Sequence, residues 1–410
     1  MGNQSLAAVL RIPGFHPTMV AVPAAFAALS VLFPTVPLAV IQSSGSQALG
    51  GATTGVFMAA TVATQLLTNK LIQRFGYRAV MVASALLLGL PALWYLVAMD
   101  PISVLVVAAL RGAGFGALCV AQYALLGQIV APSMLGKATG ILGAAVGISQ
   151  MIFLPLGLAI AERTNSYAGV FLTGAAVALL AGVLALWMPN APAPEPLETP
   201  TGQITQDSTL RVMIAPALAL SSLSMGFGAI SSFLPAALAA SGAAGAASVI
   251  AASSGVIFAV IGGAQILSRF AAGALADRLG RPGTTMLPAL LIAASGLAVI
   301  VGVLGWAWDP RCLLLAAALF GAGFGLVQTE SMLEMFLRVP RHRTGEASTV
   351  WNIAFDAGTG TGSFLLGFVA AQQGYTVAFA VAACLALVGV TAVCANQCTN
   401  MGKHENSRTA

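Results

Sequence analysis

The chain has 410 residues, of which 58% are hydrophobic and only 7% are charged. An ordinary soluble domain has about 25% charged residues, so this composition excludes soluble, disordered and nucleic-acid-binding proteins. The net charge of +5 must therefore be interpreted by its position along the chain. The composition predicts an integral membrane protein.

Long apolar segments follow one another along almost the whole chain. Lipid offers the backbone no hydrogen-bond partner, so a span must be a helix or part of a closed barrel, and a spanning helix needs about 20 apolar residues. The segments here are too long, and alternate too little, for barrel strands. We expect twelve transmembrane helices, at residues 17–42, 48–69, 79–99, 101–130, 135–161, 166–188, 210–240, 246–273, 284–307, 311–337, 346–371 and 375–396.

One sizeable connector, residues 189–209, divides these helices six and six. It contains the run Ala-Pro-Ala-Pro-Glu-Pro, which is typical of an extended polar linker. We expect an N-terminal six-helix bundle at residues 1–188, this linker in the cytoplasm, a C-terminal six-helix bundle at 210–396 and a cytoplasmic tail at 397–410.

The 17 Lys and Arg residues lie almost entirely on one side of the predicted membrane. The exceptions are Arg163 and Arg311, in connectors on the other side, and Arg111, inside a predicted helix. Because short cytoplasmic loops hold the excess of positive charge, we expect a multi-pass protein of the plasma (inner) membrane with both termini in the cytoplasm. Arg11 precedes an apolar stretch that is too long for a signal peptide, so we expect this stretch to be retained as the first helix.

Two sequence patterns occur once in each half of the chain. The run Gly-Ala-Gly-Phe-Gly at Gly112–Gly116 returns at Gly321–Gly325, 209 residues later, and the connector at residues 69–78 returns at 273–282, 204 residues later. The chain is therefore predicted to be a duplicated six-helix unit. In transporters with such repeats, the site forms near the membrane midplane between halves that rock against each other.

The run Gly-Ala-Leu-Ala-Asp277-Arg278-Leu-Gly280-Arg281 resembles the cytoplasmic loop signature of the major facilitator superfamily. The segment Leu110–Gly116 resembles that superfamily's fourth-helix signature. The resemblance covers essentially the whole chain. It implies an all-α integral membrane fold of 12 transmembrane helices in two pseudo-symmetric six-helix bundles, similar to the drug/proton antiporter and sugar-efflux branches.

Both copies of the loop signature are expected to form a cytoplasmic gate. A carboxylate there can cap a helix N-terminus and pair with Arg, while glycines permit tight turns. The first copy has Gln73 where the family has Asp and Asn69 where it has Gly, so we expect a weaker latch in the N-terminal half. Alternatively, the arginines only set the topology. The expected gating residues are Arg74, Gly76, Arg78, Asp277, Arg278, Gly280 and Arg281.

The glycine-rich runs are interpreted as helix-packing surfaces and not as nucleotide-binding loops. No predicted strand precedes them, and small residues inside apolar helices let two helices approach closely. Gly136-Lys137 lacks a glycine five residues earlier and is followed by Ala138, unlike a P-loop. ATP is therefore not an expected partner.

Four ionisable residues lie within predicted spans: Arg111, Glu330, Glu334 and Asp356. Such residues are costly in lipid and are functional candidates by default. Arg111 and Asp356 each lie about ten residues from a helix start, roughly 15 Å deep. Glu334 is expected to pair with Arg338, one helical turn later.

The three acids are the candidates for proton coupling. If the tenth and eleventh helices are neighbours, Glu330 can share a proton with Asp356, because two nearby buried carboxylates cannot both ionise cheaply. The alternative for Asp356 is a structural role, in which it bonds to Thr359, Asn352 or a backbone group.

In the family, the first, fourth, seventh and tenth helices line the substrate cavity. Aromatic and Met side chains there adapt to varied apolar shapes, although such residues also face lipid or packing partners. Arg111 has three open roles: neutralising a buried carboxylate, recognising an anionic substrate, or fastening the fourth helix to the first through backbone carbonyls. The candidate cavity residues are Arg111, Phe26, Phe33, Gln122, Tyr123, Met225, Phe227, Phe233, Gln328 and Met332.

The leading functional prediction is a proton-coupled secondary active transporter that exports small organic, amphipathic molecules by proton antiport and alternating access. Gly143, Gly147, Pro155 and Gly157 resemble the fifth-helix pattern of the superfamily's antiporters, without its adjacent Gly-Pro pair. The alternatives are a proton-coupled importer of a small anion or metabolite bound by Arg111, and a sensor that transports nothing. We expect a monomer with no enzymatic activity, cofactor, metal or nucleic-acid partner, whose partners are substrate, protons and the lipid bilayer.

Overall fold

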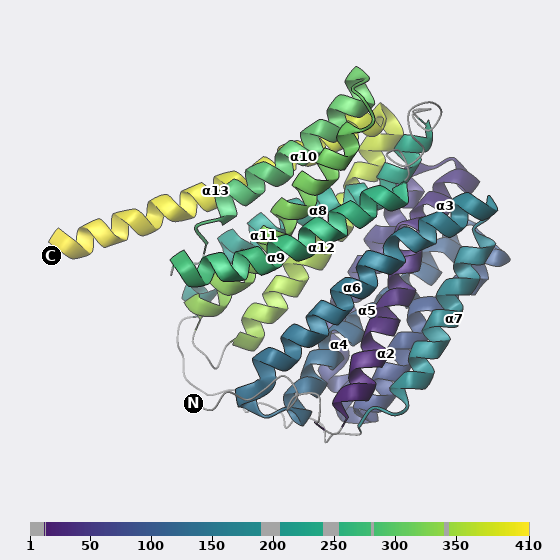
Figure 1. Ribbon diagram of the computed structural model, residues 1–410, viewed down its shortest axis with the longest axis horizontal. Helices are drawn as coiled ribbons and strands as arrows, with labels where there is room; N and C mark the ends of the chain where they lie inside the picture. The colour runs from purple at the N-terminus through teal and green to yellow at the C-terminus, as the bar shows by residue number, and fades with distance from the viewer. Residues whose placement is uncertain are drawn as a thin grey trace. The chain divides into compact units, whose positions relative to one another are not determined.

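The computed structural model describes residue 12 and residues 14–189, 206–240, 254–279, 283–339 and 344–409. The regular structure in these residues is helical, and they contain no strand. Figure 1 shows the long helices of the chain. The predicted all-α fold class is therefore confirmed.

The chain divides into two compact units, Met1–Pro200 and Thr201–Ala410, and the division falls within the predicted linker. The described helices of the first unit are α2 (Phe15–Leu32), α3 (Thr35–Ser44), α4 (Gln47–Gly89), the 3-10 helix η1 (Leu90–Leu96), α5 (Pro101–Ile129), α6 (Pro132–Thr164) and α7 (Ala168–Ala185). Those of the second unit are α8 (Gln206–Ala240), α9 (Ser254–Leu279), α10 (Met286–Trp306), α11 (Cys312–Arg338), α12 (Thr344–Gln373) and α13 (Tyr375–Thr409).

The first predicted span consists of α2 and α3, which are separated at Phe33 and Pro34. Pro34 has no amide hydrogen to donate back along the helix, and the Thr35 hydroxyl bonds the carbonyl oxygen of Val31 across the break at 2.8 Å. Phe15–Ser44 still forms one apolar segment long enough to cross a membrane. The break makes this span irregular at Phe33.

The last helix extends further than predicted. α13 continues to Thr409, so most of the predicted tail, residues 397–410, prolongs the helix of the last span. In Figure 1 its yellow end projects away from the other helices of its unit. The apolar pattern predicts where lipid contact ends, whereas a helix can continue into water with polar residues.

α4 contains a break at Gly76, whose φ of 79° and ψ of 163° are not helical. The segments on its two sides both pack on α5: a Cβ at Gly112 would collide with the backbone of Phe57, and one at Gly114 would collide with Ser84. In a straight helix residues 57 and 84 would be about 40 Å apart. The chain therefore reverses its direction at Gly76.

This reversal accounts for the number of spans. In the described part of the chain, 11 helical segments are long and apolar enough to cross a membrane, and one of them is Gln47–Leu96, with 50 residues. Because Gly76 divides that segment, the described helices correspond to the twelve predicted spans. The connector expected at residues 69–78 is corrected: it is helical except at Gly76.

Replacing Gly76 by Ala should destabilise the protein by about 1–3 kcal/mol, because its combination of φ and ψ is accessible essentially to glycine alone. Gly45 provides the control: it has a left-handed φ of 70° and ψ of 5°, which Asn adopts readily, and a Cβ there would meet nothing within 4 Å. Gly45→Asn should therefore change the melting temperature little. Thermal unfolding in detergent measures both variants, and a wild-type melting temperature for Gly76→Ala would contradict this account.

The two units repeat the same glycine-mediated packing. In each unit, two glycines lie where a Cβ would collide with the backbone of the neighbouring helix, so side chains are excluded at these positions. The glycines are offset by 209 residues and their partners by 204, as in the predicted duplication. Both the duplication and the packing interpretation of the glycine runs are confirmed. The pairs are Gly112–Phe57 and Gly116–Thr61 in the first unit, and Gly321–Ile261 and Gly325–Gln265 in the second.

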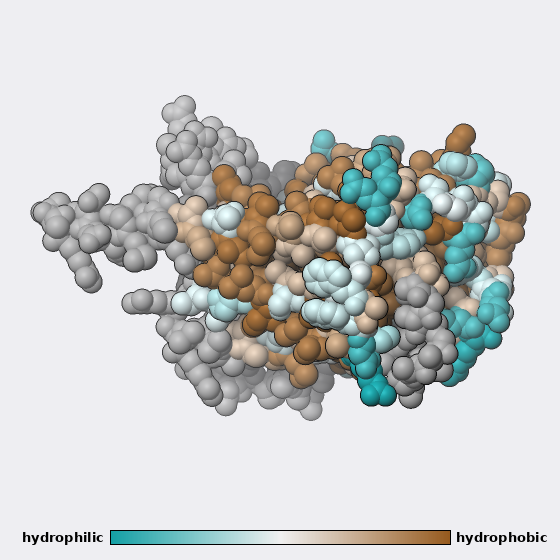
Figure 2. Space-filling view, turned by 90° about the horizontal axis from the view of Figure 1, so that it is seen from above, coloured by the Kyte–Doolittle hydropathy of each residue, from teal (hydrophilic) through white to brown (hydrophobic). Residues whose placement is uncertain are grey.

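Large apolar side chains are exposed on the helices of both units. Val97 is 79% exposed, Ile102 75%, Leu267 72% and Phe270 68%. Figure 2 shows apolar residues over much of the visible face. Such a surface suits contact with lipid and not with water. Four exposed tryptophans near helix ends are of the kind that lie at the level of the lipid headgroups: Trp94, Trp187, Trp306 and Trp308.

Candidate functional site

Arg111 is a buried cation on α5, where it is 3% exposed. Its Nε donates to the carbonyl oxygen of Leu88 at 2.9 Å, and the Tyr95 hydroxyl lies near its guanidinium. The guanidinium carbon lies 5.6 Å from the ring centre of Phe57. Its Nη2 is buried without a hydrogen-bond partner. The Leu88 carbonyl belongs to the third predicted span, whereas one of the three open roles attached Arg111 to the first span.

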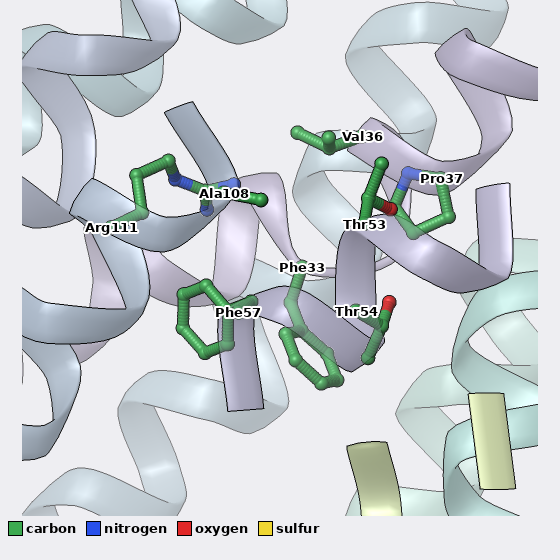
Figure 3. Close-up of a pocket in the computed structure, with 8 residues that line it drawn as sticks. All are labelled: Phe33, Val36, Pro37, Thr53, Thr54, Phe57, Ala108 and Arg111. Carbon is green, nitrogen blue, oxygen red and sulfur yellow. The ribbon is translucent and has the colours of Figure 1, made fainter. Parts of the chain in front are cut away.

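A small cavity lies beside Arg111 within the first unit, with room for about one water molecule. Its walls come from the break between α2 and α3, from α3, from the first half of α4 and from α5. Figure 3 shows the guanidinium of Arg111 directed toward the space between these elements. The lining residues are Phe33, Val36, Pro37, Thr53, Thr54, Phe57, Ala108 and Arg111.

Two of the predicted cavity residues in the first unit, Phe33 and Arg111, line this cavity. Phe26 instead lies in the hydrophobic core of the unit. Gln122 is buried, whereas Tyr123 is 44% exposed. A position on the first or fourth span therefore did not by itself predict which side chains meet.

An aromatic cluster forms around Phe227 in the second unit. The ring centre of Phe227 lies 5.3 Å from that of Phe324 and 6.3 Å from that of Phe355, and Trp351 stacks on Phe355 at 5.8 Å. Only Phe227 was predicted as a cavity residue. Trp351 and Phe355 are four residues apart on α12 and share a face, a spacing from which the sequence could have revealed them.

Gln328 joins three helices of the second unit and is 2% exposed. Its Oε1 accepts a hydrogen bond from Gln265 of α9 at 2.9 Å, and its backbone oxygen accepts one from the Trp351 indole of α12 at 3.1 Å. It lies next to the aromatic cluster and holds these helices together. The other predicted residues of this unit are buried (Phe233) or partly buried (Met225 and Met332).

Glu330 and Glu334 of α11 both approach the segment before α10. Glu330 is 1% exposed and accepts a hydrogen bond from the backbone N–H of Gly283, and a Cβ on Gly283 would lie 3.0 Å from a carboxylate oxygen of Glu334. Glu334 also forms the predicted ion pair with Arg338, which confirms that pair. Because α10 begins at Met286, the Glu330 carboxylate lies level with a helix start.

Asp356 lies in the middle of α12 and is 3% exposed. The alternative structural role pairs Asp356 with the side chain of Thr359 or Asn352. Each of these side chains donates to a backbone carbonyl oxygen of α12, the Thr359 hydroxyl at 2.9 Å and the Asn352 amide at 2.8 Å. Proton sharing between Asp356 and Glu330 stays a prediction. The observed bond of Glu330 to Gly283 was not predicted, since nothing in the sequence pairs residues 47 positions apart.

The first loop signature connects α4 to the end of α7. Arg78 Nε donates to the carbonyl oxygen of Met188, just beyond α7, at 2.9 Å, where a positive charge also complements the helix dipole. The guanidinium carbon of Arg74 lies 5.3 Å from the ring centre of Phe75. Gly76 is the residue at which the chain reverses its direction within α4. In the second signature, Gly280 and Arg281, and the side chains of Asp277 and Arg278, lie outside the described residues.

The sequence of this duplicated helical chain matches a known family. The sequence model of the Major Facilitator Superfamily matches residues 18–363, which is most of the chain. The chain belongs to the Major Facilitator Superfamily. It is therefore a multi-pass membrane transporter and not an enzyme, and the resemblance found in its loop and fourth-helix signatures is confirmed.

Solved structures of this superfamily share the fold of the transporter. The D-xylose-proton symporter is 15% identical with a TM-score of 0.73, and the similarity covers 92% of this chain and 95% of the symporter. The nucleoside transporter NupG is 12% identical with a TM-score of 0.71, covering 93% of this chain and 98% of NupG. A point mutant of NupG gives a TM-score of 0.73. At these identities the similarity shows the fold alone.

Proposed function

We propose that this transporter uses the proton gradient to export small organic, amphipathic molecules by proton antiport and alternating access. The observation that carries the proposal is Asp356, 3% exposed in the middle of α12. An ionised carboxylate is costly inside a protein surrounded by lipid, whereas the neutral acid costs much less. Binding or release of a proton therefore changes which helix arrangement is favoured, as coupling requires.

The aromatic cluster supports an amphipathic substrate. Phe227, Phe324, Phe355 and Trp351 pack against one another from three helices, α8, α11 and α12. Ring faces bind flat apolar groups and organic cations without demanding one shape. The polar link through Gln328 beside them provides a hydrogen-bonding edge.

A second candidate is proton-coupled import of a small anion. The observation that favours it is Arg111, whose buried Nη2 has no hydrogen-bond partner and whose guanidinium faces a cavity. One structural neighbour is a D-xylose-proton symporter, which supports proton coupling and favours the import direction. A sensor that transports nothing is the third candidate, and flux measurements test it together with the other two.

The purified transporter in liposomes with a trapped pH-sensitive dye distinguishes these candidates. Ethidium, an amphipathic organic cation, and benzoate, a small organic anion, are the first probes of a wider panel. Movement of a probe against the proton flow, at rates above those of protein-free liposomes, supports export. Movement of the anion together with protons contradicts antiport and supports import. Absence of coupled flux for the whole panel contradicts both and leaves the sensor.

We further propose that the transporter is a monomer of the plasma (inner) membrane with both termini in the cytoplasm, and with bundles at residues 1–188 and 210–396. The proposed topology is supported by the excess of Lys and Arg in the connectors on one side of the membrane. Gly76 and Arg78 then lie at the cytoplasmic face, where the bond from Arg78 to Met188 holds one side of the gate. Labelling of single cysteines at both termini from outside intact cells should fail if this topology is right.

A further inference from the structure

The guanidinium of Arg111 lacks a complete set of partners. Nε is satisfied by the carbonyl oxygen of Leu88, but Nη2 has no hydrogen-bond partner although it is buried. Buried polar groups in proteins are nearly always hydrogen-bonded. The site around Arg111 therefore offers a donor to a group that the described residues do not supply.

The charge of Arg111 also lacks a carboxylate partner among the described residues of the first unit. The acids of these residues are Asp100 and Glu162. Both lie at helix ends and are exposed. Asp100 is about 16 Å away along α5 and caps the start of that helix, where the hydroxyl and backbone N–H of Ser103 hold its pKa below the usual value. Buried cations are normally paired, so this one calls for a negative charge from elsewhere.

The cavity provides the place for that charge. It adjoins the guanidinium of Arg111, it has room for about one water molecule, and its other walls are apolar apart from Thr53 and Thr54. A cation is repelled there, and a neutral molecule leaves the charge uncompensated. We propose that this cavity binds a small monovalent anion, which places one negatively charged acceptor atom against Nη2 of Arg111.

The acceptor atom has two sources that share this chemistry: a halide ion, or the terminal oxygen of a small carboxylate. The ring of Phe57 lies 5.6 Å from the guanidinium carbon on one side, so the anion approaches the guanidinium from within the cavity that Arg111 lines. In binding, it neutralises the cation at the junction of α3, α4 and α5. The inference rests on the first unit alone and does not depend on the direction of transport or on proton coupling.

Thermal unfolding of the purified full-length transporter tests this site. Sodium chloride, bromide and formate are compared with methanesulfonate, a bulkier monovalent anion, at equal ionic strength. We expect a saturable rise in melting temperature of about 2 °C or more with the small anions and not with methanesulfonate. A response to the halides identifies the ion, and a response to formate alone identifies the carboxylate source.

Substitutions in and beside the cavity test whether the anion-dependent rise in melting temperature arises at Arg111. Ala108→Val fills the cavity while it keeps Arg111, and should abolish the anion-dependent rise, as should Arg111→Gln. Ala109→Val, at the next position of α5 and outside the cavity lining, should retain the rise. If the cavity variants fail to fold, crystals of the wild-type transporter grown in bromide should show anomalous scattering beside Arg111. Equal stabilisation by all four anions, a retained response in Ala108→Val, or no bromide at Arg111 would each overturn the proposal.

Discussion

Replacing Asp356 by Asn is expected to reduce gradient-driven transport to the level of protein-free liposomes, while exchange of substrate without a gradient persists. The amide keeps the size and hydrogen-bonding capacity of the neutral acid, but it cannot bind or release a proton. The measurement is dye-reported proton movement together with substrate flux in the same liposomes.

Two matched variants make this result specific to Asp356. Asp309→Asn removes an exposed carboxylate between α10 and α11 and should leave coupled transport unchanged. Glu330→Gln keeps an acceptor for the N–H of Gly283 and tests whether the two buried acids share the proton. If Asp356→Asn and Glu330→Gln both retained gradient-driven transport at wild-type rates, the carboxylate mechanism would be refuted.

Replacing Gly116 by Ala should lower the stability of the folded transporter by about 1–3 kcal/mol. The new Cβ would collide with the backbone carbonyl oxygen of Thr61, and a backbone carbonyl cannot rotate away as a flexible side chain can. Relief requires the first half of α4 to move away from α5, which weakens packing along the whole contact. Thermal unfolding in detergent, with monodispersity as a check on folding, measures the loss.

Gly127 gives the control on the same helix. Nothing lies within 4 Å of the position that its Cβ would take, and Ala is favoured over Gly in a helix by about 1 kcal/mol. Gly127→Ala should therefore be neutral or slightly stabilising. The duplicated contact, Gly325 against Gln265, should repeat the loss seen at Gly116. Equal melting temperatures for Gly116→Ala and Gly127→Ala would contradict the packing account.

The spans and the duplication could be predicted because each depends on residues close together in the sequence. A run of apolar residues excludes water wherever the helix lies, so the ends of α5 and α10 agree with the predicted spans within a few residues. The glycines at residues 112 and 321 were recognisable because a missing side chain is useful only where another helix approaches. The pair Glu334–Arg338 was predictable for a similar reason, since its spacing of one turn fixes the distance.

The partners of the buried polar groups could not be predicted in this way. Arg111 bonds Leu88, 23 residues away, and Glu330 bonds Gly283, 47 residues away. Both bonds depend on the neighbours that each helix acquires in the folded unit, so spacing along the chain does not contain them. The spacing of Trp351 and Phe355 places them on one face of α12, but only the fold shows that this face meets Phe227 and Phe324.

The sequence by itself determined that this protein spans the membrane, how often it does so, and that it is built from two related halves. Those properties follow from the hydrophobicity of each segment and from short sequence patterns that recur along the chain, and both can be recognised without the fold. Only the tertiary structure decided that the turn expected at residues 69–78 is confined to Gly76 within otherwise helical sequence, and that Arg111 faces a cavity without a carboxylate partner among the described residues of its unit. These depend on backbone conformation and helix packing, because a hydrogen bond or an ion pair forms only between groups that the fold brings together.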